Sequence, residues 1–266
     1  MPDHEILSAR ADTGTGHVGT YRRTLPVSLE RMYENTLDWE HLPHVHAGSF
    51  GSIDCIDAGA WGWRATVTDP RGSESVIELT LDRPLRRWIT RNLEGPNKGA
   101  EIWTHVFPVA PDQLEIVVDF FVPGVSESAR DKVGQAYAGL YSRLYDEDVA
   151  MMVERQHQLD NRIDPGEREV ELGSRESLTL PMQVTLGSQR YVIDSIDDEL
   201  IGYPALCPHQ LGPLADSAVE DGTVTCPWHG YRFDVRTGDC VSGQSCRLRP
   251  LQFSESDGAV RVSLKS

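Results

Sequence analysis

The chain has 266 residues, of which 41 are acidic and 25 basic, so its formal net charge is −16. This charge argues against a nucleic-acid-binding protein, because contacts to phosphates need clusters of Lys and Arg. No apolar run approaches the roughly 20 residues that cross a bilayer, so we expect no membrane segment. The first ten residues lack the apolar core of a signal peptide, and five cysteines in a chain of this length do not form a disulfide scaffold. We therefore expect a cytoplasmic globular protein of one or two domains.

The first part of the chain is predicted to contain many strands and one long helix. The stretch 51–122 is divided by turns that contain Pro next to Asp or Gly, and its pieces are rich in β-branched and aromatic residues. The stretch 126–158 carries apolar residues at helical spacing. This order predicts a sheet followed by a helix of unusual length.

A polar segment with Pro165 and Gly166 predicts a boundary between two domains. After this segment, short strands alternate with turns, which is typical of an all-β domain. We expect these strands at residues 179–186, 189–195, 200–204 and 258–264. The predicted organisation is a first domain over 1–165, a linker over 166–176 and a second domain over 177–266.

Cysteine and histidine residues are paired in the second domain at a spacing that suits metal binding. Cys207-Pro208-His209 is followed, after 16 residues, by Cys226-Pro227-Trp228-His229. Two Cys and two His can hold a structural zinc, or a [2Fe–2S] cluster in which two His replace two Cys on one iron. Each loop supplies one Cys and one His, which favours the cluster, because zinc fingers usually pair like ligands within one loop.

The loops Cys207–Gly212 and Cys226–Phe233 resemble the ligand loops of the Rieske family, and the following Asp234–Cys240 resembles its strand and turn. The resemblance covers about residues 178–264. It implies that the two Cys and the two His of the motif hold a [2Fe–2S] cluster.

High-potential Rieske proteins carry one more cysteine in each loop, and these two cysteines form a disulfide. Pro213 and Trp228 stand at the corresponding positions of this chain. The chain therefore resembles the lower-potential branch, which includes ferredoxins and oxygenases. The other three cysteines, Cys55, Cys240 and Cys246, are interpreted as packing residues.

Three histidines within six residues indicate a second metal site in the first domain: His41, His44 and His46. A non-haem Fe(II) site uses two His and one carboxylate and leaves positions for O₂ and substrate. His41 shares a helix face with Asp38, but His41 and His46 differ by about 140° on a straight helix. Pro43 supplies a break that could bring them together. By spacing alone, His41 with His44 is an equal candidate pair.

The pattern Asn-x-x-Asp-x-x-His, followed by four residues and a second His, resembles the mononuclear iron motif of Rieske oxygenases. It maps onto Asn35, Asp38, His41 and His46. The resemblance implies that the two histidines ligate iron. It also implies that Asp38 lies between this iron and a cluster-ligating histidine and takes part in electron transfer, while His44 has no role.

The long helix offers three adjacent carboxylates as the third iron ligand: Asp146, Glu147 and Asp148. Asp148 lies inside the apolar stripe of this helix, Asp146 lies on the opposite face, and Glu147 lies near the edge. Burying even a neutral polar group without a partner costs about 2–7 kcal/mol, and a metal would relieve this cost. We therefore predict Asp148 as the ligand. The alternative is a carboxylate that meets Lys, Arg or water at a helix end.

The two motifs together predict an α+β protein. Its first domain resembles the helix-grip fold (START or Bet v 1-like), an antiparallel sheet around a long C-terminal helix, and its second is an all-β Rieske domain. The domain order is the reverse of the usual one in Rieske oxygenases, and the first domain is short for that family.

The resemblance implies an oxygenase that receives electrons from a separate NAD(P)H-dependent reductase or a ferredoxin. The cluster would pass them to a mononuclear Fe(II), which would activate O₂ for hydroxylation, dihydroxylation or demethylation of a small organic substrate. A homotrimer is the oligomer that the family implies. The alternative is an electron-transfer protein or a redox sensor whose first domain binds a ligand but no iron.

Overall fold

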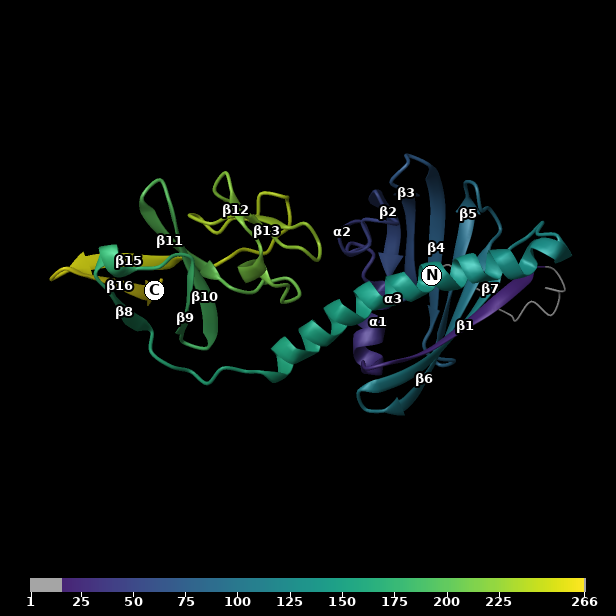
Figure 1. The fold of residues 1–266 in the computed structure, drawn as a ribbon, viewed down its shortest axis with the longest axis horizontal. Coiled ribbons are helices and arrows are strands. Elements are labelled where there is room, and N and C mark those ends of the chain that lie inside the picture. Colours follow the sequence, from purple (N-terminus) through teal and green to yellow (C-terminus); the bar gives the residue numbers. More distant parts are fainter. Residues whose placement is uncertain (1–15, 266) are drawn as a thin grey trace. The chain divides into compact units, whose positions relative to one another are not determined.

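The structure is a computed structural model that describes residues 16–265, so the ten N-terminal residues considered above lie outside the described part. The chain forms two compact units, Met1–Val153 and Glu154–Ser266 (Figure 1). The long helix α3 (Arg130–Asp160) begins in the first unit and ends in the second. None of the helices formed by residues 16–265 has the length and apolar character needed to cross a membrane.

In its described part, the first unit is built on one seven-stranded antiparallel sheet with the order β1-β7-β6-β5-β4-β3-β2. The strands are β1 (His17–Leu25), β2 (Ser52–Gly59), β3 (Gly62–Thr68), β4 (Glu74–Asp82), β5 (Arg87–Glu94), β6 (Glu101–Ala110) and β7 (Gln113–Phe121). Consecutive strands pair from β2 to β7, and β1 closes the order by pairing with β7. Two short helices, α1 (Leu29–Leu37) and α2 (Leu42–Val45), connect β1 to β2.

One face of this sheet packs against α3, which lies across it in Figure 1. Alternate residues of β7 from Leu114 to Phe120 are fully buried, as the two-residue period of a strand requires. The Phe120 ring lies 5.3 Å from Tyr137 and 5.1 Å from Tyr141, both on α3. The predicted helix-grip arrangement is therefore confirmed. A single turn of 3-10 helix, η1 (Glu127–Ala129), precedes α3.

Two glycines allow α3 to approach β1 closely. A Cβ atom at Gly134 would lie 2.1 Å from the carbonyl oxygen of Val18, and one at Gly19 would lie 3.2 Å from the Gly134 Cα. Side chains at these positions would push the helix away from the strand. Gly139 on the same helix is different, since a Cβ there would meet no atom of the described residues within 4 Å.

The described residues of the second unit form three small antiparallel sheets with the orders β11-β10-β9, β12-β13-β14 and β15-β16-β8. The strands are β8 (Glu169–Gly173), β9 (Met182–Leu186), β10 (Gln189–Ile196), β11 (Glu199–Pro204), β12 (Val219–Glu220), β13 (Thr223–Thr225), β14 (Arg232–Asp234), β15 (Leu251–Ser256) and β16 (Ala259–Leu264). Single turns of 3-10 helix occur at η2 (Arg175–Ser177) and η3 (Leu214–Asp216). The all-β character expected for this part of the chain is confirmed.

The structure differs from the prediction in the segment 166–176, which was expected to be a linker. This segment contains β8, which pairs with β16. Val170 and Leu172 pack against the core of the second unit, whereas Glu171 lies on the outside and forms an ion pair with Arg261. The polar composition of the segment thus comes from an edge strand, which has one face in water.

Candidate metal centres

The backbone around α1 and α2 places the predicted histidine ligands. The side chain of Ser28 accepts a hydrogen bond from the Arg31 N–H and caps α1, which ends at Asp38 in an extended conformation. His41 precedes α2, Pro43 lies in the first turn of this short helix, and His46 follows its last residue. This break replaces the straight helix, so the rings of His41 and His46 approach to 5.2 Å between centroids.

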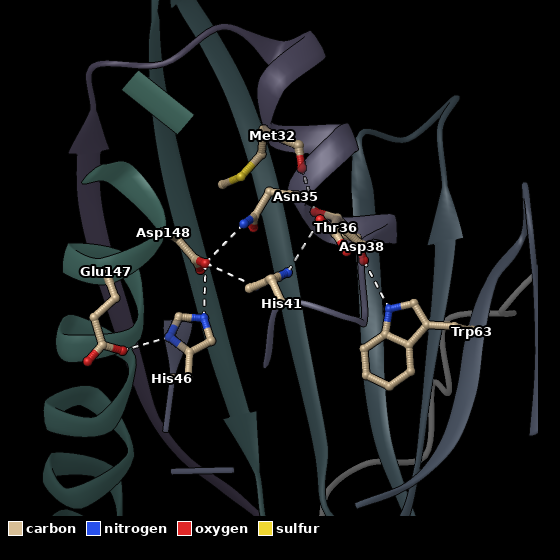
Figure 2. Close-up of polar contacts among 9 residues, drawn as sticks. All are labelled: Met32, Asn35, Thr36, Asp38, His41, His46, Trp63, Glu147 and Asp148. Atoms are coloured by element: carbon tan, nitrogen blue, oxygen red, sulfur yellow. Dashed lines mark hydrogen bonds and ion pairs between the residues drawn. The ribbon is translucent and has the colours of Figure 1, made fainter. Parts of the chain in front are cut away.

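Three buried side chains converge in the first unit: His41, His46 and Asp148 (Figure 2). The Nε2 atoms of His46 and His41 lie 3.0 Å and 3.3 Å from Oδ1 of Asp148. The atoms that could bind a metal lie within 4.8 Å of one another. Asn35 Nδ2 donates a hydrogen bond of 2.9 Å to the same Oδ1. His44, the alternative partner of His41, is exposed and does not belong to this group.

His41 is the most unusual member of this triad. Within the described residues, neither ring nitrogen makes an aligned hydrogen bond, although Nδ1 lies 3.9 Å from Oδ2 of Asp38. Burial alone would lower the pKa of His41, but the carboxylates of Asp148 and Asp38 outweigh burial and raise it to about 10. The pKa of Asp148 lies well below its usual range despite burial, because both histidines stabilise its anion. Two imidazole nitrogens and a buried carboxylate are a donor set that fits Fe(II).

Glu147 orients one of the histidines, a role that the sequence did not reveal. Its Oε2 lies 2.6 Å from Nδ1 of His46, which leaves Nε2 of this ring facing Asp148 (Figure 2). Histidines that bind metals usually donate their other N–H to a carboxylate or a carbonyl group. Asp146 points elsewhere and forms an ion pair of 2.7 Å with Arg23. Only Asp148 of the three adjacent carboxylates lies close to both histidines.

A cavity of about 130 Å³ adjoins the triad. Aromatic and aliphatic side chains from the sheet and from α3 form most of its wall, among them Trp63, Trp88, Ile77, Leu79, Tyr141 and Tyr145. The Trp63 indole donates a hydrogen bond of 3.0 Å to the carbonyl of Thr36, which fixes the ring. Burial raises the pKa of Tyr145 well above its usual range, so its hydroxyl stays neutral.

A second candidate site lies in the second unit, where two loops have similar backbones. The Leu211 N–H donates to the carbonyl of Cys207 at 3.0 Å, and the Gly230 N–H donates to that of Cys226 at 2.9 Å. Leu211 and Gly230 have φ angles of 65° and 66°. Each loop therefore turns back four residues after its cysteine.

These loops bring together the four residues predicted to hold the cluster. Cys207 and Cys226 are buried, and the rings of His209 and His229 lie edge to face with centroids 4.5 Å apart. A Cβ at Gly212 would lie 2.7 Å from Sγ of Cys226, so only glycine fits beside this sulfur. The interaction between the two thiols lowers the pKa of Cys226 to about 5 and raises that of Cys207.

The three remaining cysteines are not the packing residues that we expected. Cys55 is exposed on β2, at the edge of its sheet, and Cys240 and Cys246 are only half-buried. All three are free thiols in the described structure. Their positions follow from turns and sheet edges, which composition alone does not reveal.

Comparisons with known proteins give separate matches for different parts of the chain. Residues 167–252 match the Rieske [2Fe-2S] domain family. The chain is 38% identical over 87 residues to the anthranilate 1,2-dioxygenase ferredoxin subunit of Burkholderia cepacia. These aligned residues make up 32% of this chain and 79% of that protein.

Solved structures with a similar fold cover about half of the chain. Norcoclaurine synthase from Thalictrum flavum has 18% identity and a TM-score of 0.40, with 51% of this chain and 85% of that one covered. The Zhui aromatase/cyclase from Streptomyces sp. R1128 has 11% identity and a TM-score of 0.41, with 51% and 93% covered.

Proposed function

Because the chain belongs to the Rieske [2Fe–2S] family, we propose that it is a Rieske-type oxygenase with a second, mononuclear iron in its first unit. The single observation that carries this proposal is the buried triad of His41, His46 and Asp148 beside an apolar cavity. Fe(II) bound there would supply the activation of O₂ for hydroxylation, dihydroxylation or demethylation of an organic substrate.

The residues around the triad have distinct roles in this proposal. Asn35 holds Oδ1 of Asp148 by a hydrogen bond, and Glu147 holds His46 in the orientation needed for ligation. The apolar wall of the cavity excludes water and binds the substrate. A cavity of about 150 Å³ is sufficient for benzene, so the substrate, or the part of it that enters, has about the size of one ring.

Asp38 is proposed to act in electron transfer to the mononuclear site. Its carboxylate is buried and lies 3.9 Å from Nδ1 of His41, the nitrogen directed away from Asp148. The cluster, held by Cys207, His209, Cys226 and His229, would receive its electrons from a separate reductase or ferredoxin. A homotrimer is the proposed oligomer.

Iron content tests this proposal directly. Anaerobically purified wild-type protein is expected to hold three iron atoms per chain, two in the cluster and one in the triad. His46→Ala should reduce the content to two, because it removes a ligand. His44→Ala is the matched control, since this exposed histidine lies outside the triad, and three atoms should remain.

A second candidate function predicts a different result. The similarity to a ferredoxin subunit favours an electron-transfer protein whose first unit binds a ligand but no iron. Wild-type protein and His46→Ala would then both contain two iron atoms per chain. This result would rule out the oxygenase.

A further inference from the structure

Two free thiols face each other across a hairpin of the second unit. Asp239 and Arg247 form an isolated antiparallel bridge, and Cys240 and Cys246 are the next residues towards the turn. The two thiol groups lie within reach of a direct hydrogen bond to each other. A disulfide needs two cysteines whose side chains already approach each other in this way.

The surroundings of the two sulfur atoms differ. Sγ of Cys240 lies 3.3 Å from the hydroxyl of Ser242 and 3.4 Å from Oε1 of Gln244. Partial burial raises the pKa of Cys240, but hydrogen bonds from Ser242 and from backbone amides outweigh it, so the pKa is lowered. Burial and the neighbouring Cys240 raise the pKa of Cys246. Cys240 is therefore the better nucleophile near neutral pH.

This hairpin is attached to the strand that follows the second cluster loop. Cys240 forms a bridge with Phe233 of β14, and the Val241 N–H donates a hydrogen bond of 2.8 Å to the carbonyl of Arg232. The Arg232 N–H in turn donates to the Ser242 hydroxyl at 3.0 Å. A covalent link between the two cysteines would thus stiffen a loop that is bonded directly to β14.

We infer that Cys240 and Cys246 form a reversible intrachain disulfide, with a low-molecular-weight disulfide such as oxidised glutathione as the oxidant. The Cys240 thiolate attacks one sulfur of oxidised glutathione, which forms a mixed disulfide and releases one glutathione thiolate. Cys246 then attacks the sulfur of Cys240 and releases the second glutathione. The two protons lost by the protein thiols end on the two reduced glutathione molecules. Excess reduced glutathione reverses both steps. This modification is independent of the proposed oxygenase function.

Peptide mapping of the full-length protein, with its cluster in place, tests the inference. The protein is incubated anaerobically with oxidised glutathione, alkylated and digested with trypsin. Both cysteines fall within one tryptic peptide, Thr237–Arg247, which has no internal Lys or Arg. We expect this peptide to lose two hydrogen atoms and to resist alkylation at both cysteines. Dithiothreitol should restore both alkylation sites.

Three variants separate the roles of the thiols. Cys55→Ser is the control and should convert like the wild type. Cys246→Ser should trap glutathione on Cys240, and Cys240→Ser should form its adduct on Cys246 more slowly. Two alkylated cysteines in the treated wild-type peptide would overturn the inference. So would a wild-type peptide that carries glutathione and has not lost two hydrogen atoms.

Discussion

The contact between Glu147 and His46 gives the most specific test of the triad as a metal site. Glu147→Gln removes the charge of this side chain but leaves an oxygen that can still accept the proton on Nδ1 of His46. The present distance of 2.6 Å is that of a strong, charge-assisted hydrogen bond. Losing the charge weakens the hydrogen bond that orients the imidazole, so the affinity of His46 for a metal should fall.

The expected size of the effect follows from this geometry. Loss of such a partner weakens metal binding about 10- to 100-fold, which is about 1.4–2.7 kcal/mol. The Glu147 side chain is 44% exposed, so screening by water favours the lower half of this range. An anaerobic titration of the full-length protein with Fe(II) against a competing chelator measures the affinity.

Asp146→Asn is the matched control for this experiment. It removes the same charge from the adjacent residue, whose side chain is 62% exposed and pairs with Arg23. We expect a change of no more than about twofold, because exposed charges are screened by salt. Equal losses in both variants would show that net charge, not the orientation of His46, determines the affinity. An unchanged affinity in Glu147→Gln would also refute the reasoning.

Further predictions concern electron transfer, pH and packing. Asp38→Asn should keep the wild-type iron content and abolish product formation with a reductase present; unchanged product formation would contradict its assigned role. The pKa of His41, about 10 without metal, means that its proton must leave when iron binds at pH 7, so about one proton per iron should be released. Calorimetry in buffers of different ionisation enthalpy measures this release, and binding should weaken as the pH falls; no proton release would contradict the raised pKa. Gly134→Ala should lower the free energy of unfolding by about 1–3 kcal/mol, because its Cβ would clash with the Val18 carbonyl. Gly139→Ala should raise the free energy of unfolding by up to about 1 kcal/mol, because alanine has a higher helix propensity than glycine. Thermal unfolding that shows both variants stabilised, or both destabilised, would refute this account.

The spacing of residues within short motifs predicted most residues of the candidate sites. This works because residues a few positions apart are held together by the local backbone alone. Cys207 and His209 belong to one tight loop, and Cys226 and His229 belong to another, so their spacing already describes the loop geometry. The role of Glu147 could not be predicted in this way. Its partner His46 is 101 residues away in sequence, and only the packing of α3 on the sheet brings the two together.

The differences between prediction and structure have a common physical origin. The segment 166–176 is polar because β8 has one face in water, and this composition also suits a linker. Cys240 and Cys246 are predicted to pack near the cluster because the motif already supplies four ligands, but both are only half-buried. Their partial exposure follows from a turn that is closed by the bridge between Asp239 and Arg247. In neither case does local composition indicate the structure that brings these residues to water.

The separation of the triad along the chain has a consequence for unfolding of the first unit. His46 and Asp148 are 102 residues apart in sequence, although their side chains are in contact. An ion bound to both would close a loop that includes every strand from β2 to β7. In the chain-entropy model, a covalent link across about 100 residues is worth about 5 kcal/mol, and a metal link acts in the same sense. Such an ion would be a reversible cross-link between α2 and α3. Separation of α3 from the sheet and dissociation of the metal would then occur together.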